Sequence, residues 1–254
     1  MSRVLDKAFG NPMKLEEDAS AFLAGGILQH GYQCGMVWGS ALAAGAQIYK
    51  VHGPGPESET RAIIAAQKIV EVFQDRFKHF NCLEITEISK SSSVMDMIVF
   101  FLIKGGTIHC FRMASKFAPL AYTEIDAVIS EKNIESPEAP ASCVSLLMKK
   151  MGASELHTMM AAGLAGGIGL CGGACGALGA AIWVHGMNTL KEPDGKIRFS
   201  DPKASEIIEK FLKAADYEFE CSEIVGRKFE NVKDHSDYLQ NGGCAKIIDA
   251  LADI

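Results

Sequence analysis

The stretch Ala165-Gly166-Gly167-Ile168, with Cys171-Gly172-Gly173-Ala174-Cys175-Gly176 just after it, repeats a stretch near the start of the chain. There Ala24-Gly25-Gly26-Ile27 is followed by Cys34-Gly35-Met36-Val37-Trp38-Gly39. Both copies read AGGI followed by CGxxxG, so Cys34 is predicted to correspond to Cys171. Self-similarity over a long spacing is typical of a duplicated structural unit. The sequence therefore predicts two tandem halves of similar structure.

Two further patterns recur in the same order in each half. Asn81-Cys82-Leu83-Glu84-Ile85 resembles Glu220-Cys221-Ser222-Glu223-Ile224, with CxEI in common. Farther along, Gly105-Gly106 precedes Cys110 and Gly242-Gly243 precedes Cys244. Three cysteines thus recur in order, whereas Cys143 has no counterpart among the first residues of the chain. The first half is a degenerate copy of the second.

Helical spacing of apolar residues runs through most of the chain. A set at i, i+3, i+4 and i+7 includes Ala62, Ile63, Ala66, Ile69, Val70 and Phe73. The segment from Ser93 to Ile103 could be a strand or a buried helix. We predict an all-α fold in which the two halves pack as a pseudo-dimer. The predicted boundaries are 1–132 for the first repeat, 133–141 for a polar, proline-bearing linker and 142–254 for the second repeat.

Composition restricts the function classes. The net charge is −6 and the sequence pI about 5.7, with no run of Lys or Arg, so nucleic acid is not an expected partner. The segment from Met159 to Val184 carries no charge and is long enough to span a bilayer, but its glycines and its lack of flanking Lys/Arg asymmetry argue against insertion. The N-terminal residues do not resemble a secretory signal, so we expect a cytoplasmic protein. In a reducing compartment the eight cysteines would be ligands, redox thiols or core residues.

The cysteine order in the second half resembles the C-GCAxxG-C-C family of redox-active proteins. Similar domains occur beside iron–sulfur centres in cytochromes of the split-Soret type. The motif alanine is replaced by Gly173 in the second half and by Met36 in the first. The resemblance implies a cysteine-bound iron–sulfur site whose four ligands would be Cys143, Cys171, Cys221 and Cys244. It implies that the remnant of a second site consists of Cys34, Cys82 and Cys110.

The chemistry of cysteine agrees with this implication. Iron–sulfur clusters are typically held by four thiolates, and both [2Fe–2S] and [4Fe–4S] remain open. Gly172 and Gly176, as cofactor-binding residues, would let backbone N–H groups approach the cluster. Cys175 is open to three roles: alternative ligand, resolving thiol or small core residue. His30 and His109 could complete a site in the first half, although surface or capping roles are the more common ones for histidine.

Three functions are carried forward. The leading one is electron transfer through the iron–sulfur site, as a carrier or a component of an oxidoreductase, with a redox protein as partner. The second is a thiol–disulfide oxidoreductase using Cys171, Cys175 and Cys221. The third is a non-catalytic helical protein that binds zinc or associates with a membrane transporter. A homodimer is compatible with all three.

Overall fold

The structure is a computed structural model that describes residues 1–137 and 140–253. It is built of helices, and the described residues form no strand beyond two isolated bridges. The all-α prediction is confirmed. In the first half the helices are α1 (Ser2–Ala8), α2 (Lys14–Ala19), the 3-10 turn η1 (Ser20–Leu23), α3 (Gly35–His52), α4 (Pro56–Phe77), α5 (Cys82–Thr86), α6 (Val94–Ile98), the π-helical turn η2 (Val99–Ile103) and α7 (Gly106–Ser130). In the second half they are α8 (Cys143–Lys150), α9 (Glu155–Ala162), α10 (Gly176–Lys191), α11 (Pro202–Ala214), α12 (Cys221–Val225), α13 (Val232–Gln240) and α14 (Ala245–Ala252).

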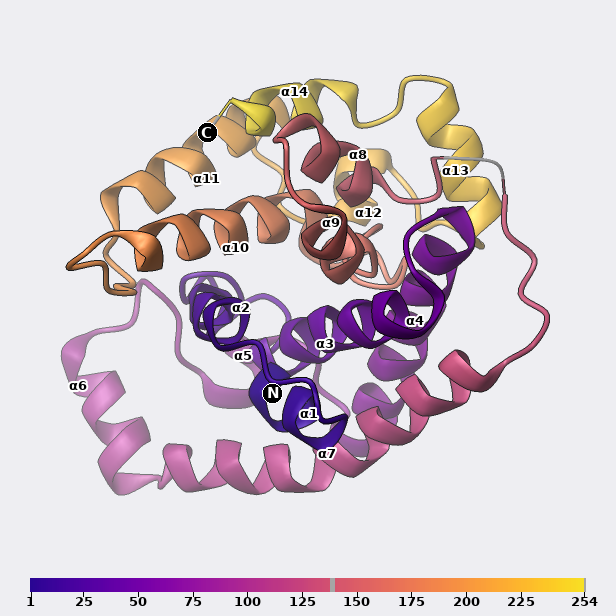
Figure 1. Ribbon diagram of the computed structural model, residues 1–254. Helices are drawn as coiled ribbons and strands as arrows, with labels where there is room; N and C mark the ends of the chain where they lie inside the picture. Colours follow the sequence, from indigo (N-terminus) through magenta and orange to yellow (C-terminus); the bar gives the residue numbers. More distant parts are fainter. Residues whose placement is uncertain (138–139, 254) are drawn as a thin grey trace.

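The two halves repeat the same order of elements. Each has a short first helix, a second short helix, a long buried helix, an amphipathic helix that begins at a proline, and a one-turn helix that begins at a cysteine. Ala24 and Ala165 lie 141 positions apart, as do Cys34 and Cys175, and each cysteine immediately precedes the long helix of its half, α3 or α10. The tandem arrangement predicted from the motifs is therefore visible as a repeat of helices (Figure 1).

The halves are interlocked rather than merely adjacent. α2 of the first half packs on α10 of the second, and α9 of the second half packs on α3 of the first (Figure 1). Equivalent glycines allow both approaches: Gly45 of α3 lies against the backbone of α9, and Gly186 of α10 lies against α2. Each half thus completes its core with a helix of the other, which is the pseudo-dimer expected from the sequence.

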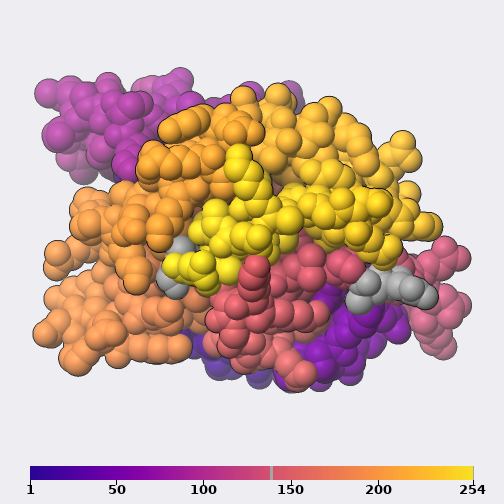
Figure 2. All heavy atoms as spheres, turned by 90° about the horizontal axis from the view of Figure 1, so that it is seen from above, coloured from indigo at the N-terminus to yellow at the C-terminus, as the bar shows by residue number. Residues whose placement is uncertain are grey.

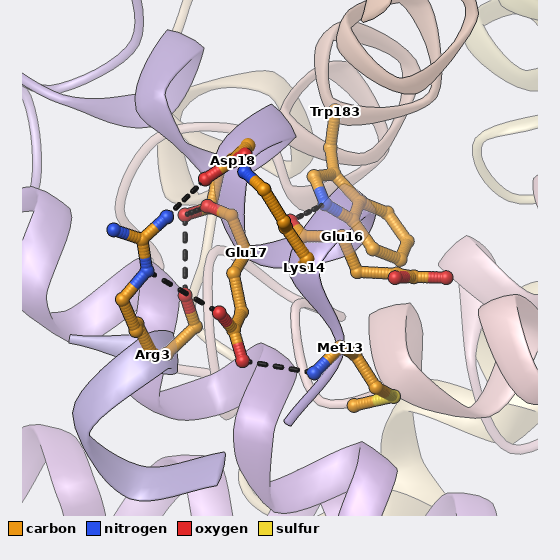
Figure 3. A network of polar contacts seen from close by, with 9 residues as sticks. Arg3, Met13, Lys14, Glu16, Glu17, Asp18 and Trp183 are labelled. Carbon is orange, nitrogen blue, oxygen red and sulfur yellow. Dashed lines mark hydrogen bonds and ion pairs between the residues drawn. The ribbon is translucent and has the colours of Figure 1, made fainter. Parts of the chain in front are cut away.

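Polar contacts fix the same junction, as Figure 3 shows around α2. The indole Nε1 of Trp183 donates to the carbonyl oxygen of Glu16 at 3.0 Å, and the carboxylate of Glu16 lies 2.9 Å from Nε2 of His157. Glu16 and His157 are also 141 positions apart, so equivalent residues of the two halves meet at this junction. On the opposite side of α2, Arg3 pairs with Glu17 and Asp18.

Each AGGI motif begins a turn whose backbone lies in the left-handed region. Residues 25–29 and 166–170 all have positive φ, although three of the first set and two of the second are not glycine. L-residues enter this region at a cost of about 1–2 kcal/mol each, so such a run exists only where its surroundings hold it. Glycine is required at Gly26 and Gly167, because a Cβ there would collide with the backbone of Tyr32 and of Gly173. The turn brings the chain back to place Cys34 or Cys175 at the start of the long helix.

Three local predictions can be compared with the structure. The uncharged stretch from Met159 to Val184 is divided between α9, a loop and α10, and lies largely buried at the centre of the fold. The segment from Ser93 to Ile103 is helical, as α6 and η2, but it is exposed rather than buried. The described part of the linker, 133–137 and 140–141, contains no helix; the predicted linker residues 138 and 139 lie outside the described residues.

By length and hydropathy, no single described helix could cross a membrane. One bent pair of segments, Val94–Ile103 and Gly106–Ser130, does pass the same test of length and composition.

Candidate functional site

Four cysteines of the second half each stand at the beginning of a helix. Cys143 is the first residue of α8 and Cys221 is the first residue of α12. Cys175 and Cys244 are the N-cap residues of α10 and α14. We call these four residues the four-cysteine cluster. The beginning of a helix carries unpaired N–H groups and the positive end of the helix dipole, so it favours a thiolate or another anion.

The four thiols lie close enough to interact electrostatically in all six pairs. The thiolates of Cys175, Cys143 and Cys244 raise the pKa of Cys221, in addition to the larger effect of burial. Burial first, and then Cys143 and Cys175, also raise the pKa of Cys244. Burial and the Cys175 thiolate raise the pKa of Cys143 to about 12. These thiols converge from four helices at one buried place.

A short backbone clamp joins two members of the cluster. The N–H of Cys175 donates to the carbonyl oxygen of Phe219 at 2.9 Å, and the N–H of Cys221 donates to the carbonyl oxygen of Gly173 at 2.7 Å. These bonds flank the isolated antiparallel bridge between Ala174 and Glu220. The loop that carries Cys175 is thereby fixed to the start of α12, independently of any bound group.

Polar groups around the cluster oppose the rise in thiol pKa. Backbone N–H groups of Leu178 and Ala177, in the first turn of α10, favour the thiolate of Cys175. The backbone of Gly166, in the left-handed turn, does the same for Cys143. The Tyr238 hydroxyl favours the thiolate of Cys244. The site thus combines apolar burial with donors directed at sulfur, as cysteine-bound redox centres require.

The structure separates Cys171 from this cluster. Burial and the carboxylate of Glu71 raise its pKa to about 11, no other cysteine contributes, and its thiol lies 3.5 Å from the carbonyl oxygen of Gly169. The position equivalent to Cys171 in the first half is His30, 141 residues earlier.

The expected correspondence of Cys34 with Cys171 is therefore wrong. Cys34 is the N-cap of α3, and its N–H donates to the carbonyl oxygen of Phe80 at 3.0 Å, as the N–H of Cys175 donates to Phe219. The counterpart of Cys34 is Cys175. In the second half Cys171 opens the CGxxxG pattern and Cys175 lies inside it four residues later, which is why the motif alone selected the wrong cysteine.

Gly172 and Gly176, predicted as cofactor-binding residues, are placed against protein atoms. A Cβ on Gly176 would collide with the backbone of Leu164, so this glycine lets the loop after α9 cross the start of α10. Gly172 has φ +81°, and its carbonyl oxygen accepts from the N–H and the hydroxyl of Ser222. Both residues shape the backbone that carries Cys175.

The first half brings together Cys34, Cys82 and Cys110, the three-cysteine cluster. Burial and the thiolates of Cys82 and Cys110 raise the pKa of Cys34 to about 12, and burial followed by the Cys110 thiolate raises the pKa of Cys82. At the position of Cys143, 141 residues earlier, stands Ser2, the first residue of α1, buried with its hydroxyl 3.2 Å from that of Ser20. A serine therefore takes the place of the fourth thiol.

The two histidines considered for the first half lie elsewhere. The ring of His30 stacks on Phe219 at 5.5 Å between centroids, and burial lowers its pKa. His109 is exposed on α7. Neither histidine contributes to the pKa shift of a cysteine in the three-cysteine cluster.

A cavity opens beside the four-cysteine cluster. It has a volume of about 350 Å³ and reaches Cys244, Tyr238 and the Gly242-Gly243 pair. Its other walls carry the carboxylates of Asp216, Glu218 and Glu223, together with Lys246. This is where the half-buried thiol of Cys244 approaches solvent, and the CxEI residue Glu223 belongs to its lining.

The residue types of the four-cysteine cluster favour metal binding, whereas the positions of its side chains do not yet form a metal site. Four cysteines are the ligands that iron–sulfur clusters, or a structural zinc, take from a protein. All eight cysteines of the chain are free thiols, and among the described residues no three His, Cys, Asp or Glu side chains are arranged to hold a metal ion. The chemistry of the donor set fits such a group, while closure of the ligands around it would require movement of the thiol side chains.

Comparison with known protein families supports the repeat and a redox role. The model of a family described as "Putative redox-active protein (C_GCAxxG_C_C)" matches residues 1–120 and again residues 140–254. No curated protein and no solved structure matches the chain. The double match agrees with the repeated helices, and the family description supports a redox role.

Proposed function

Since the chain belongs to the C_GCAxxG_C_C family over both of its halves, we propose that it is an electron-transfer protein with an iron–sulfur cluster in its second half. The proposed ligands are Cys143, Cys175, Cys221 and Cys244. This set replaces Cys171 of the sequence-based prediction with Cys175. The observation that carries the proposal is the convergence of four thiols, each from the start of a different helix, at one buried place.

Electrostatics supports a bound cation at this place. Four buried thiolates repel one another, which is why burial and mutual charge raise their pKa values. Positive metal ions remove that repulsion and allow all four thiols to ionise. A bound cluster would supply one-electron redox chemistry. The helix N-termini and the hydroxyl of Tyr238 would stabilise its negative charge, and the apolar shell would keep water away.

The thiol–disulfide alternative is less well supported. A catalytic thiol needs a pKa near or below the pH at which it works, and the attacking form is the thiolate. Burial raises the pKa of all eight cysteines here. Of the three residues proposed for this chemistry, Cys171 lies apart from the pair formed by Cys175 and Cys221. The other alternative is a zinc ion bound by the four-cysteine cluster, and measuring iron, sulfide and zinc per chain distinguishes it from an iron–sulfur cluster.

The proposed partner is a redox protein that approaches the cavity beside Cys244. The carboxylates of Asp216, Glu218 and Glu223 give this entrance a negative potential, so a partner with a basic contact surface is favoured. We propose a cytoplasmic location for the exchange, acting as a carrier or as a component of an oxidoreductase.

The experiment is anaerobic purification followed by an optical spectrum and by measurement of iron, acid-labile sulfide and zinc per chain. The two variants that distinguish the proposed ligand from the sequence-based one are Cys175→Ser and Cys171→Ser. The two thiols are four residues apart, and Cys175 is buried while Cys171 is half-buried, so the substitutions are well matched. We expect Cys175→Ser to lose the cluster absorbance and Cys171→Ser to retain it at wild-type iron content.

Two results would contradict the proposal in different ways. Loss of iron in Cys171→Ser but not in Cys175→Ser would restore Cys171 as the fourth ligand and reject Cys175. A wild-type chain that takes up zinc but no iron and sulfide, even after anaerobic reconstitution, would reject the iron–sulfur function itself.

A further inference from the structure

Most of the exposed large apolar side chains gather on one projecting part of the molecule. Of the fourteen in the described part of the chain, nine lie between Val94 and Leu120, on α6, η2 and the first half of α7, which we call the apolar hairpin. The two most exposed are Leu102 at 78% and Ile103 at 75%, next to the bend between its arms. The hairpin stands out from the body of the protein in Figure 2, at the upper left, and along the lower left edge of Figure 1.

The hairpin is a built element and not a frayed end. Ser93 caps α6, and its hydroxyl and backbone N–H are bound reciprocally to Asp96. At the bend, the ring of Phe100 occupies the space where a side chain at Gly106 would lie. Lys104 pairs with Glu87 at 2.6 Å, which ties the bend to the residues after α5. The apolar residues are therefore held outward by specific contacts.

The second half shows that this exposure is not required by the fold. In the corresponding place it carries the polar helix α13, of which Val232, His235, Ser236 and Leu239 are buried. His235 also bonds to the carbonyl oxygen of Ala141 at 2.9 Å. By contrast, no residue of α6 is buried, and Phe100 is the one buried residue of η2.

The charge of the hairpin differs from that of the rest of the chain. Within it, between residues 94 and 120, stand Lys104, Arg112 and Lys116, with Asp96 as the one acidic residue and Lys104 paired with Glu87 outside it, whereas the whole chain has a net charge of −6. Arg112 and Lys116 are exposed on α7 beside Ile108 and Phe111. Cations flanking exposed Phe, Leu and Ile side chains are the pattern of segments that lie in the interface of an anionic membrane.

We propose that the apolar hairpin inserts into the surface of an anionic phospholipid bilayer and attaches the protein to it. The segments that contain it, Val94–Ile103 and Gly106–Ser130, are bent by 60° relative to each other and together pass a test of length and composition for a membrane segment. A second copy of the chain fits the hairpin less well. Outside it, the exposed large apolar residues of the described chain are scattered, at Val4, Val51, Leu83, Phe199 and Tyr217. A copy would have to pair hairpin with hairpin, which would bring their cations together.

The test is sedimentation of the full chain with vesicles of phosphatidylcholine containing about 30% phosphatidylserine, compared with phosphatidylcholine alone. We expect the chain to bind the anionic vesicles and to be released as the salt concentration rises. Leu102→Glu with Ile103→Glu should weaken binding by more than roughly a hundredfold, because two apolar anchors are replaced by anions. Arg112→Gln with Lys116→Gln should weaken it by about thirtyfold.

Matched controls separate the hairpin from a general effect of the substitutions. Val51→Glu with Tyr217→Glu adds the same charges at exposed apolar positions elsewhere, and Lys210→Gln with Lys213→Gln removes two exposed cations of α11. Both controls should bind as the wild type does. All four variants change exposed side chains, so an unchanged melting temperature verifies that they fold.

Three outcomes would overturn the proposal. They are equal binding of the wild type to the two vesicle types, an equal loss of binding in the controls, and absence of binding. Size-exclusion chromatography with light scattering tests the alternative partner. If the wild type forms dimers and the double variant Leu102→Glu with Ile103→Glu does not, the hairpin binds a second copy of this chain instead. None of these outcomes depends on whether a cluster is bound.

Discussion

Gly45 and Gly186 offer a matched test of the interlocked halves, because they are equivalent positions with different clearances. A Cβ at Gly45 would lie 2.6 Å from the carbonyl oxygen of Met160 and 2.7 Å from its Cα, and still closer to the carbonyl oxygen of Met159. Ordinary contact begins at 3.4 Å, so α3 and α9 would have to separate by roughly 1 Å or more, since the carbonyl oxygen of Met159 is the nearest of these atoms. Backbone atoms of a packed helix cannot turn aside as a side chain can.

The energetic consequence for Gly45→Ala follows from two opposed effects. Overpacking of this kind costs about 1–3 kcal/mol or more, and a gap of about 0.5–1 Å forfeits about a quarter to a half of the dispersion energy of the contacts it opens. Alanine returns up to about 1 kcal/mol of helix propensity. We expect a net loss of about 2 kcal/mol, which lowers the melting temperature of a chain of this size by about 4–8 °C.

At Gly186 the same substitution meets less resistance. A Cβ there would lie 2.9 Å from a ring carbon of Phe22, 3.0 Å from the carbonyl oxygen of Ala19 and 3.3 Å from its Cβ. A shift of roughly 0.5 Å is enough, and the gain in helix propensity offsets its cost. The assay is thermal unfolding followed by far-ultraviolet circular dichroism. An unchanged or raised melting temperature in Gly45→Ala would refute the close packing of α9 on α3, and an equal fall in Gly186→Ala would refute the difference in clearance between the two sites.

Three further predictions concern single groups. Burial raises the pKa of Asp6 to about 7, so the folded chain holds a proton that the unfolded chain releases near pH 4. The contribution of this group to the free energy of unfolding therefore falls as the pH rises from about 4 to about 7. Asp6→Asn should raise the melting temperature more at about pH 8 than at about pH 5. Trp183→Phe removes the 3.0 Å hydrogen bond to the carbonyl oxygen of Glu16 and leaves space where a fully buried indole packed, so it should cost more in urea unfolding than the about 0.5–1.5 kcal/mol of the hydrogen bond alone. Ser2→Cys supplies a thiol at the position of Cys143 and should raise iron and sulfide per chain after reconstitution; an unchanged content would contradict the equivalence of Ser2 and Cys143 as ligand positions.

The duplication was the part of the fold most accessible from the sequence. AGGI and CxEI each occur twice in the same order, and a repeated motif implies repeated structure whatever its local conformation. The pairing of Cys34 with Cys175 was also encoded, since Ala24 to Cys34 and Ala165 to Cys175 span equal lengths of chain. The CGxxxG spacing concealed it, because Cys171 and Cys175 both belong to the second copy of that pattern.

Other features lay beyond sequence patterns for physical reasons. The left-handed turns place Ile27, Leu28 and Gln29 at positive φ, against their intrinsic preference, so local propensity predicts something else. The packing of α2 on α10 and of α9 on α3 depends on which glycine faces which helix. Helical periodicity predicts the buried face of a helix but not the helix that packs against it. The sequence predicts a strand or a buried helix from Ser93 to Ile103, whereas the segment is helical and exposed. Hydrophobicity alone cannot distinguish a core helix from a helix whose apolar side chains face outward.

The interlocked architecture explains how one half can lose a cysteine while the fold is retained. α2 of the first half packs on α10, the helix that begins at Cys175, so the first half supports the four-cysteine cluster through packing and not through its own thiols. Exchanging a buried thiol for the hydroxyl of Ser2 leaves that packing intact, because the hydroxyl finds a partner in Ser20. The AGGI turn has no such freedom, since Gly26 and Gly167 each lie against backbone that cannot move. The backbone that positions the cysteines is therefore the same in both halves, whereas the cysteines themselves differ.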